Sequence, residues 1–502
     1  MTASRHLAAR HVMIRVDANQ WHSSAYRDTA YRLIDDGVCG VGVFLGELEE
    51  TATMIGDLQQ RAGGTLLVAA DYEYGLPMRL EGGIAFPRAM ALGRSSAHTT
   101  QSCAALIAEE ARAIGVHWNW APVADINSNP HNPIINTRSF GESAECVAEH
   151  VRAYIRGTQS SGLLSCAKHF PGHGDTSVDS HLALPTIDVA EHVAMERELV
   201  PFAAAIDEGV GSIMVGHIVV PFLDAELPAS LSRRVITDLL RVRMGYNGLV
   251  CTDALDMHAI ADRWTSGTAA VMSIKAGADV ALMPDNVDEA LSAIELAIDR
   301  DEISRDLLDA SSGRIDAAKA SVGIGSSDVR KPLAIDQNTH ALVALTAASQ
   351  GIAVEGDASL LPLSQHKHIA ALAVVSDADM NAATTWFQAL TQAIETNIDC
   401  GYIDGTISDG EIADLAHGLG EADVFVVALF GKAVAYRGHL PGAERLPKII
   451  ADLASGRPVI VVACGSPYGI DTLNANCTVY TYSDTLPSIA ASILRLIGRN
   501  LG

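Results

Sequence analysis

The stretch L-L-S-C-A-K-H-F-P-G-H-G-D-T-S-V-D-S-H, residues 163–181, passes from an apolar run into a long polar loop. Its first part, 163–167, has the length and composition of a buried strand. The glycines and the proline that follow disfavour a regular element and favour a long loop. A buried strand that opens into a polar loop is the unit that recurs on both sides of this stretch, and it decides the fold.

Seven further apolar, β-branched runs lie in the same half of the chain, and each precedes a segment with helical spacing of Ala, Leu and Ile. They occupy residues 12–16, 39–44, 65–70, 116–121, 212–215, 249–252 and 278–283. Eight such βα units in about 320 residues predict a (β/α)₈ TIM barrel. Continuously apolar strands also fit a parallel sheet that is buried on both faces.

A polar stretch with Gly and Pro, residues 323–332, then interrupts the pattern. We therefore expect a catalytic barrel over 1–325, a linker over 326–335 and a smaller domain over 336–502. The apolar runs of the second part, at 369–375, 424–430, 459–463 and 479–482, again alternate with helical patterns. They are too few to close a barrel, so they predict an open α/β sandwich.

The composition excludes several classes of protein. Asp and Glu outnumber Lys and Arg by 60 to 35, a formal charge of −25 that argues against a nucleic-acid partner. No apolar run is long enough to span a membrane, and residues 1–9 lack the order of a secretory signal. We expect a soluble, cytoplasmic protein. Its eight cysteines are scattered without a C-x-x-C pair, which favours buried thiols over disulfides or a metal site.

Polar side chains cluster where the predicted barrel strands end, which is where barrels of this kind carry their chemistry. They are Asp71, Glu73, Asp125, Lys168, His169, His217 and Asp253. Charged groups gathered at one rim are unfavourable to desolvate unless a ligand neutralises them. The pattern therefore predicts a polar ligand.

Less specific interpretations exist for each of these residues. Asp125 or Asp253, taken alone, fits a carboxylate that caps the following helix. His217 fits a hydrogen-bonded core histidine, and Asp256 a solvated or capping side chain. The histidines of residues 168–181 also invite a zinc site, but they lack the i, i+4 helical spacing of common zinc motifs, so we predict no metal there.

Four loops together resemble glycoside hydrolase family 3, in particular its two-domain bacterial β-N-acetylglucosaminidase branch. K-H-F-P-G-H-G-D-T-S-V-D-S-H, 168–181, resembles the hallmark of that branch, and G-L-V-C-T-D-A-L-D-M, 248–257, its nucleophile segment. Residues 129–141 and 71–79 are similar to two of its sugar-binding loops, although Tyr74 stands where the family usually has glycine. R-P-V-I-V-V-A-C-G-S-P-Y, 457–468, is similar to the second domain of two-domain members.

The resemblance implies roles for particular residues. Asp253 would be the nucleophile, His181 the acid/base and Asp179 the residue that orients His181. The substrate-binding residues would be Asp71, Arg138, Lys168, His169, His217 and Met257. No metal or organic cofactor is implied.

Retaining cleavage needs a nucleophile at the anomeric carbon and a proton donor at the leaving oxygen, normally two carboxyl groups. An imidazole titrates near neutral pH, so it can donate that proton and later accept one from water. An aspartate two residues earlier could accept the other ring N–H and fix the tautomer. The nucleophile must be ionised, so we expect nearby cations or donors to lower the pKa of Asp253. The glycine-rich loop, 170–180, is expected to move during turnover.

The predicted activity is exo-acting removal of terminal N-acetylglucosamine from peptidoglycan or chitin fragments, as in peptidoglycan recycling. Two alternatives within the family stay open, a phosphorylase and a β-glucosidase. A non-catalytic sugar-binding protein is a third alternative, from a different class. The expected partner is a small amino-sugar glycoside, and the sequence leaves the oligomeric state open.

Overall fold

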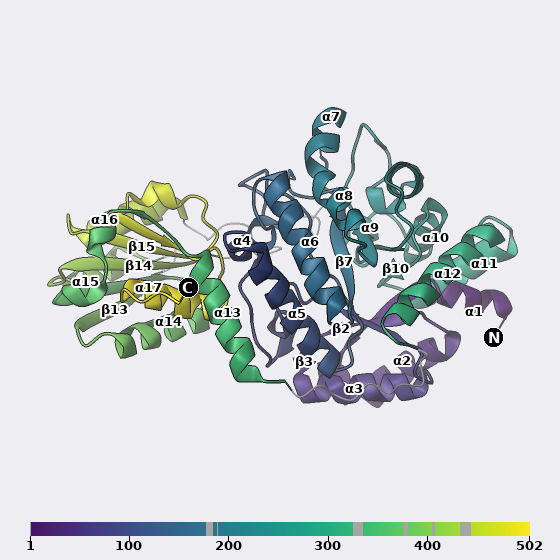
Figure 1. Cartoon of the computed structure of the whole chain (residues 1–502), viewed down its shortest axis with the longest axis horizontal. Coiled ribbons are helices and arrows are strands. Elements are labelled where there is room, and N and C mark those ends of the chain that lie inside the picture. The colour runs from purple at the N-terminus through teal and green to yellow at the C-terminus, as the bar shows by residue number, and fades with distance from the viewer. Residues whose placement is uncertain are drawn as a thin grey trace. The chain divides into compact units, whose positions relative to one another are not determined.

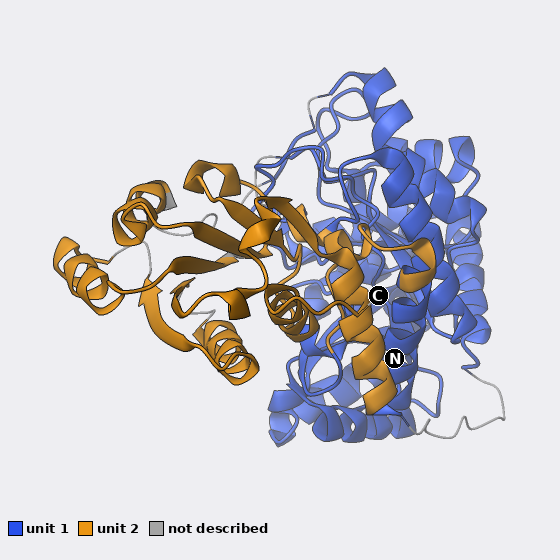
Figure 2. Cartoon of the chain, turned by 60° about the vertical axis from the view of Figure 1, so that its left-hand side comes forward, with its two compact units in different colours: residues 1–84, 100–135, 139–337 blue, residues 85–99, 136–138, 338–502 orange. Residues whose placement is uncertain are grey.

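The computed structural model describes residues 2–176, 184–187, 189–324, 335–375, 380–403, 407–431 and 443–501. The chain forms two compact units, which Figure 2 distinguishes by colour. The first contains residues 1–84, 100–135 and 139–337, and the second contains 85–99, 136–138 and 338–502. Residues 85–99 and 136–138 therefore belong to the second unit, although they lie within the part of the sequence that forms the barrel. The pattern of apolar runs did not predict this assignment. Of the expected linker, 326–335, only Ile335 lies within the described residues.

The first unit is built on an eight-stranded parallel sheet in the order β10-β1-β2-β4-β6-β7-β8-β9. A parallel bridge between Cys251 and Val280 joins the last strand to the β10 segment, so the sheet returns to its start. The strands are β1 (Val12–Asp17), β2 (Gly40–Phe44), β4 (Leu67–Ala70), β6 (Trp118–Asn119), β7 (Leu164–Phe170), β8 (Ser212–Val215), β9 (Leu249–Thr252) and β10 (Ala281–Leu282). Figure 1 labels β2, β7 and β10 among them. The predicted TIM barrel is confirmed.

Helices follow these strands, as parallel strand connections require. In chain order they are α1 (Ala3–Ala9), α2 (Ser24–Asp36), α3 (Leu48–Arg61), α5 (Ala97–Ala113), α6 (Ala144–Ser160), α7 (Glu191–Val193), the π-helix η4 (Ala194–Glu198), α8 (Val200–Asp207), the π-helix η6 (Arg234–Arg243), α9 (His258–Ala261), α10 (Ser266–Ala276), α11 (Val287–Asp299) and α12 (Arg305–Ser321). Two short strands, β3 (Gly46–Glu47) and β5 (Leu80–Glu81), pair outside the barrel.

Packing in the barrel interior explains the alternation Gly40-Val-Gly42 in β2. A Cβ atom on Gly40 would lie 2.1 Å from the carbonyl oxygen of Leu67 on the next strand, and one on Gly42 would lie 2.6 Å from the Trp120 ring. Trp118 and Trp120 fill the interior with rings 5.9 Å apart in an edge-to-face arrangement. Gly42 therefore provides space for the Trp120 ring, and Gly40 allows close approach of the neighbouring strand.

The second unit contains a six-stranded sheet in the order β11-β16-β15-β14-β12-β13. Its strands are β11 (Ala353–Gly356), β12 (His368–Val374), β13 (Asn397–Ile403), β14 (Val424–Gly431), β15 (Val459–Gly465) and β16 (Cys477–Tyr480). All neighbours pair in parallel except β11, which runs antiparallel to β16. The sequence predicted the four inner strands and missed β11 and β13, the two edges.

Helices cover both faces of this sheet. The unit's helices are α4 (Ala89–Leu92), α13 (Gln337–Gly351), α14 (Met380–Ala393), α15 (Asp409–Gly418), α16 (Leu446–Ala454) and α17 (Leu486–Leu496). One core cluster joins one face of the sheet to α14 and α17 through side chains such as Trp386 and Ile493. A second joins the other face to α15 and α16 through side chains such as Leu415 and Leu453. The predicted α/β sandwich is confirmed.

All eight cysteines lie in the described ranges and are free thiols. Six are buried, as predicted, whereas Cys400 on the edge strand β13 is exposed. None of the helices in the described ranges combines the length and the apolar composition that spanning a bilayer requires.

A buried carboxylate holds the barrel together where the sheet closes. Asp279 is fully buried and accepts hydrogen bonds from Arg241 at 2.7 Å and from Arg314 at 2.8 and 2.9 Å. It also accepts the backbone N–H of Val250, at 2.8 Å, on the neighbouring strand β9. One anion therefore connects η6, α12 and β9 to the start of β10.

We predict that Asp279→Asn lowers the free energy of unfolding of the barrel by about 3 kcal/mol, because two partly buried guanidinium groups lose the fully buried carboxylate that they share. Urea denaturation followed by tryptophan fluorescence measures this, since four of the five tryptophans lie in the first unit. The control is Asp309→Asn, which removes a carboxylate that is 57% exposed and paired with Arg305. It should change stability by less than about 1 kcal/mol, and equal losses in the two variants would contradict the role of Asp279.

Candidate active site

Asp253 stands directly after β9 at the carboxyl end of the barrel. Its backbone N–H donates to the Val215 carbonyl at 2.9 Å, which extends the strand pairing by one residue. Its carboxylate accepts the N–H of Ala254 at 2.8 Å. The next helix, α9, begins only at His258 with Met257 as its N-cap, so Asp253 does not cap it. The capping interpretation of Asp253 is therefore wrong.

His217, after β8, fixes the backbone beside Asp253. The ring is fully buried, with Nδ1 2.7 Å from the Ser230 hydroxyl and Nε2 2.8 Å from the Ala254 carbonyl oxygen. A carbonyl oxygen only accepts, so Nε2 carries the proton of this bond. The hydrogen-bonded core histidine that the sequence offered as an alternative matches this geometry, and the same ring contributes to the electrostatic field at Asp253.

The electrostatic surroundings of Asp253 favour its ionised form. Burial alone would raise its pKa, but His169, His217, the Ala254 N–H and Lys168 together outweigh burial and lower it below the usual value. The pKa of Asp253 is therefore low, as predicted, because nearby donors and cations stabilise the charged carboxylate. A carboxylate whose surroundings favour the charged form is suited to nucleophilic attack.

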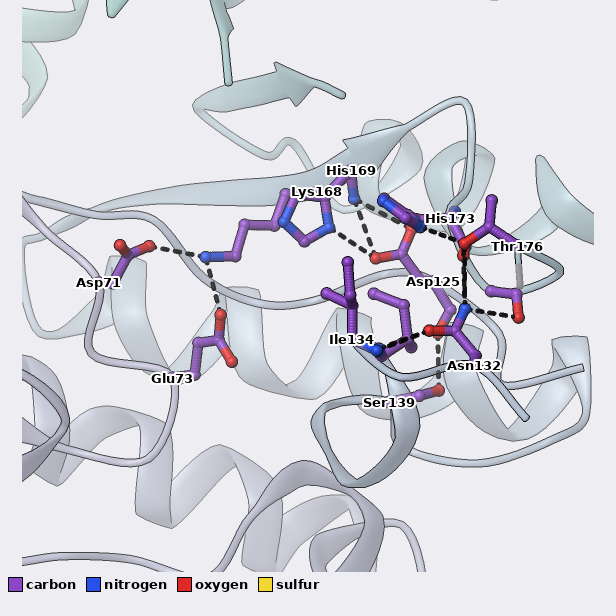
Figure 3. Close-up of polar contacts among 12 residues, drawn as sticks. Asp71, Glu73, Asp125, Asn132, Ile134, Ser139, Lys168, His169, His173 and Thr176 are labelled. Atoms are coloured by element: carbon purple, nitrogen blue, oxygen red, sulfur yellow. Dashed lines mark hydrogen bonds and ion pairs between the residues drawn. The ribbon is translucent and has the colours of Figure 1, made fainter. Parts of the chain in front are cut away.

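Lys168, at the end of β7, lies between two carboxylates from the loop after β4. Its Nζ is 2.7 Å from an oxygen of Asp71 and 2.8 Å from one of Glu73, as Figure 3 shows. The three side chains are nearly buried, with 3%, 12% and 9% of their surfaces exposed. Arg79 also pairs with Asp71. Burial opposes ionisation of Asp71, yet the charges of Lys168 and Arg79 lower its pKa to about 2. The cluster presents oriented charged donors and acceptors to a polyhydroxyl ligand.

Asp125 organises the polypeptide that follows Lys168. It is fully buried and accepts the backbone N–H groups of His169, at 3.1 Å, and His173, at 2.7 Å. Its other oxygen lies 2.7 Å from Nδ1 of His169, which fixes that ring with its proton on Nδ1. Burial would raise the pKa of Asp125, but His169 and these donors lower it. Asp125 therefore holds a loop rather than capping a helix, contrary to that interpretation.

The first part of the polar loop, residues 171–176, which we call the loop stem, is tied down by Asn132 (Figure 3). Its side-chain N–H₂ donates to the carbonyl oxygens of His173 and Gly174 at 2.8 and 3.0 Å. A Cβ atom on Gly174 would lie 1.5 Å from the Ile126 carbonyl oxygen, so only glycine fits there. The second glycine of the G-H-G pattern is thus required by close backbone contact.

His173 is a neutral member of the stem. Burial lowers its pKa to about 4, with the Asp125 charge opposing the shift. Its Nδ1 lies 2.7 Å from the Thr176 hydroxyl, and its Nε2 has no hydrogen-bond partner among the described residues. Among the described residues, no group of three or more His, Cys, Asp and Glu side chains could hold a metal ion.

The structure brings together Asp71, Lys168, His169, His217 and Asp253, five of the residues expected at the rim. Met257 is half-buried four residues after Asp253. Arg138 lies in η3 (Asn136–Arg138), which belongs to the second compact unit.

Asp179 and His181 lie outside the described residues. Asp256, expected to be solvated or capping, is half-buried, and burial together with the charge of Asp253 raises its pKa. Asn132 was missed, although it lies in one of the loops singled out by sequence, because an isolated asparagine in a loop gives no signal of its partner. Glu73 was noted at the strand end but given no role, and its contact with Lys168 depends on the loop conformation.

Comparisons of this chain with known proteins all point to the same family. The model of the glycosyl hydrolase family 3 N-terminal domain matches residues 14–318. A β-hexosaminidase A from Pseudoalteromonas piscicida is 32% identical over 346 residues, which cover 62% of this chain and 57% of that protein. A β-N-acetylglucosaminidase/β-glucosidase from Cellulomonas fimi is 32% identical over 335 residues, covering 64% and 59%. The chain therefore spans less than two thirds of the length of these two relatives.

Solved structures extend the likeness to both domains. A family 3 β-N-acetylglucosaminidase from Paenibacillus sp. str. FPU-7 superposes with a TM-score of 0.86 at 30% identity, covering 100% of this chain and 97% of that one. A β-glucoside phosphorylase superposes with a TM-score of 0.88 at 23% identity, covering 100% and 93%, and this second likeness concerns the fold alone. The family that the four loops predicted is the family found.

We predict that Asp125→Asn destabilises the barrel at pH 7 by about 3 kcal/mol, because the His169 and His173 donors lose a charged acceptor. The pKa of Asp125 is lower in the folded than in the unfolded chain, so its charge stabilises the fold above the unfolded value near 4. That contribution disappears as the pH falls through the folded value. In urea titrations at pH 7 and at about pH 3, the difference between variant and wild type should therefore be smaller at the lower pH, with the decrease confined to pH values below about 4.

The control for this measurement is Asp207→Asn, whose carboxylate is 72% exposed and 3.4 Å from Arg152. It should leave stability almost unchanged at both pH values. A difference between Asp125→Asn and wild type that stays constant over this range would show that the charge of Asp125 is not what stabilises the stem.

Proposed function

The chain belongs to glycoside hydrolase family 3, and from that premise we propose that it is a retaining, exo-acting β-N-acetylglucosaminidase. The observation that carries the proposal is the position of Asp253 directly after β9, where His169, His217 and Lys168 lower the pKa of its carboxyl group. A carboxylate in this position can form a covalent glycosyl-enzyme. The names of the two relatives and of the Paenibacillus structure support an amino-sugar glycoside as substrate.

The ion-paired cluster of Asp71, Glu73 and Lys168 would bind the hydroxyl groups of the terminal sugar. Carboxylates accept and the ammonium donates, so the cluster can satisfy several hydroxyls at once. His169 adds a ring whose Nδ1–H is committed to Asp125, so that its Nε2 is the atom left to contact a sugar hydroxyl. We include Arg138 and Met257 among the substrate-binding residues on the resemblance of their loops.

The proposed reaction has two steps. An oxygen of Asp253 attacks the anomeric carbon while His181 gives its proton to the leaving glycosidic oxygen, so the glycosidic bond breaks as the ester bond forms. In the second step His181 takes a proton from water, and the water oxygen displaces Asp253 from the sugar. Asp179 would accept the other ring N–H of His181, which sets the tautomer and raises the basicity of the imidazole.

Terminal N-acetylglucosamine on peptidoglycan or chitin fragments is the proposed natural substrate. Two alternatives within the family need direct tests. A neutral imidazole repels phosphate less than a glutamate would, so phosphorolysis is chemically open. Sugar 1-phosphate would form only in the presence of phosphate if the enzyme were a phosphorylase. The second alternative is a β-glucosidase, since the Cellulomonas relative is named for both activities. Comparing the rates of hydrolysis of nitrophenyl N-acetylglucosaminide and nitrophenyl glucoside tests it.

We predict that Asp253→Asn lowers kcat on nitrophenyl N-acetylglucosaminide by at least about 10⁴-fold, because an amide cannot form the glycosyl-enzyme. A 2-deoxy-2-fluoro or 5-fluoro glycoside should label the wild type once. Mass spectrometry of the digested protein should place the label on the peptide that contains Asp253.

The control for the trapping experiment is Asp262→Asn, an exposed carboxylate nine residues further along the chain. It should keep wild-type turnover and label normally. A label on a different carboxylate would reject Asp253 as nucleophile, and the absence of both label and turnover would leave a non-catalytic sugar-binding protein as the better interpretation.

We predict that His181→Ala slows cleavage of natural disaccharides by about 10³-fold but slows cleavage of dinitrophenyl glycosides much less, because a good leaving group needs no proton. The measurement is kcat/KM over a series of aryl leaving groups of different pKa. The variant should show a steep dependence on that pKa and the wild type a shallow one. Equal losses across the series would mean that His181 is not the acid.

A further inference from the structure

Glu198 is a buried carboxyl group that the proposed mechanism does not use. It ends the π-helix η4 (Ala194–Glu198), and only 2% of its side chain is exposed. One oxygen accepts from Nε of Arg197 at 2.6 Å. The other oxygen, Oε2, is buried and has no hydrogen-bond partner among the described residues. Such an arrangement is unfavourable for a charged carboxylate and needs an explanation.

The unpaired oxygen lies against the loop stem. A Cβ atom on Gly172 would lie 3.1 Å from both Cβ and Oε2 of Glu198, so the stem backbone packs directly on the carboxyl group. Arg197, the preceding residue, donates to Asp175 at 2.9 Å. Two consecutive residues of η4 therefore contact the stem at two points, three residues apart.

The surroundings of Glu198 favour its neutral form. Burial raises its pKa to about 7, against the attraction of Arg197, and the negative charges of Asp125 and Asp175 raise it further. On its remaining side the carboxyl lines a small pocket whose other walls are apolar, including Pro171, Ile187 and Leu199. No described wall of this pocket donates a hydrogen bond to an ionised Oε2, so ionisation requires the stem to shift or water to enter.

We propose that Glu198 is a positioning residue for the active-site loop, whose neutral carboxyl holds the stem in its described conformation and whose ionisation releases it. This inference rests on the proposed glycosidase function, because the proposed acid/base follows the stem by only five residues in sequence. The stem also contains His173, whose backbone N–H is bound by Asp125. Movement of the stem would therefore disturb the hydrogen bonds that hold His169.

The test is amide hydrogen exchange of the full-length protein, read on the peptides that cover the stem, from pH 6 to pH 8.5. Exchange times are scaled so that the chemical rate is equal at each pH. In the wild type, protection of the stem should fall roughly tenfold across this range as Glu198 ionises. Glu198→Gln keeps the shape and stays neutral, so its stem should remain protected throughout.

The matched control is Glu196→Gln, two residues away on the same helix and exposed to solvent. It should follow the wild-type curve. Asp175→Asn is a second variant, usable even where Glu198→Gln does not fold. It removes a negative charge that raises the pKa of Glu198, so loss of protection should begin at lower pH. A wild-type stem whose protection is independent of pH, or a Glu198→Gln stem that follows the wild type, would overturn the proposal.

The pH dependence of kcat tests the positioning role independently of hydrogen exchange. The alkaline limb of kcat on a dinitrophenyl N-acetylglucosaminide, which needs little acid catalysis, should move to higher pH in Glu198→Gln and stay in place in Glu196→Gln. An unchanged limb in Glu198→Gln would count against the positioning role while the glycosidase function stood. Absence of turnover in the wild type would reject the proposed function, but the exchange experiment would still decide how Glu198 acts on the stem.

Discussion

The carboxylate of Asp125 is the constraint on which the arrangement of the site depends. It accepts two backbone N–H groups and one imidazole N–H from the segment that follows Lys168. A buried anion that binds three donors favours one loop conformation strongly, since any rearrangement would leave its charge unpaired. It fixes the direction of His169, and with it part of the field that keeps Asp253 ionised. A single structural carboxylate thus fixes the shape of the loop stem and orients one of the groups that lower the pKa of the proposed nucleophile.

The rim could be predicted from sequence because each of its residues directly follows an apolar strand. Asp253, Lys168 and Asp71 need only the strand assignment and the rule that barrel chemistry lies at carboxyl ends. Their partners could not be predicted in the same way. Whether Asp253 capped a helix or faced a ligand depended on where α9 begins, and α9 begins five residues later, at His258. Asn132 contacts residues more than 40 positions away, which no local pattern encodes.

In the fold, too, elements with a local apolar pattern could be predicted from sequence, whereas elements that depend on tertiary contacts could not. The inner strands are continuous apolar runs because both of their faces are covered by helices. The edge strand β13 has the sequence N-I-D-C-G-Y-I and mostly exposed or half-buried side chains, so it lacks that signal. It becomes a strand through pairing with β12 along its whole length. The stretches 85–99 and 136–138 join the second compact unit for a similar reason, since tertiary contacts rather than composition assign them.

Glu198 shows why a charged residue in a helical segment is difficult to interpret from sequence. In M-E-R-E-L-V-P-F the two glutamates have equivalent surroundings in the sequence, yet Glu196 is exposed and Glu198 buried. Two residues apart on a helix, the two side chains project to nearly opposite sides. The backbone at Glu198 is a π-turn, in which Leu199 donates to the carbonyl of Ala194, five residues earlier. Pro201 has no N–H for the Arg197 carbonyl, which removes one of the bonds that would hold a regular α-helix there. Glu198 lies on the buried side of this irregular turn, where its carboxyl group packs against the loop stem.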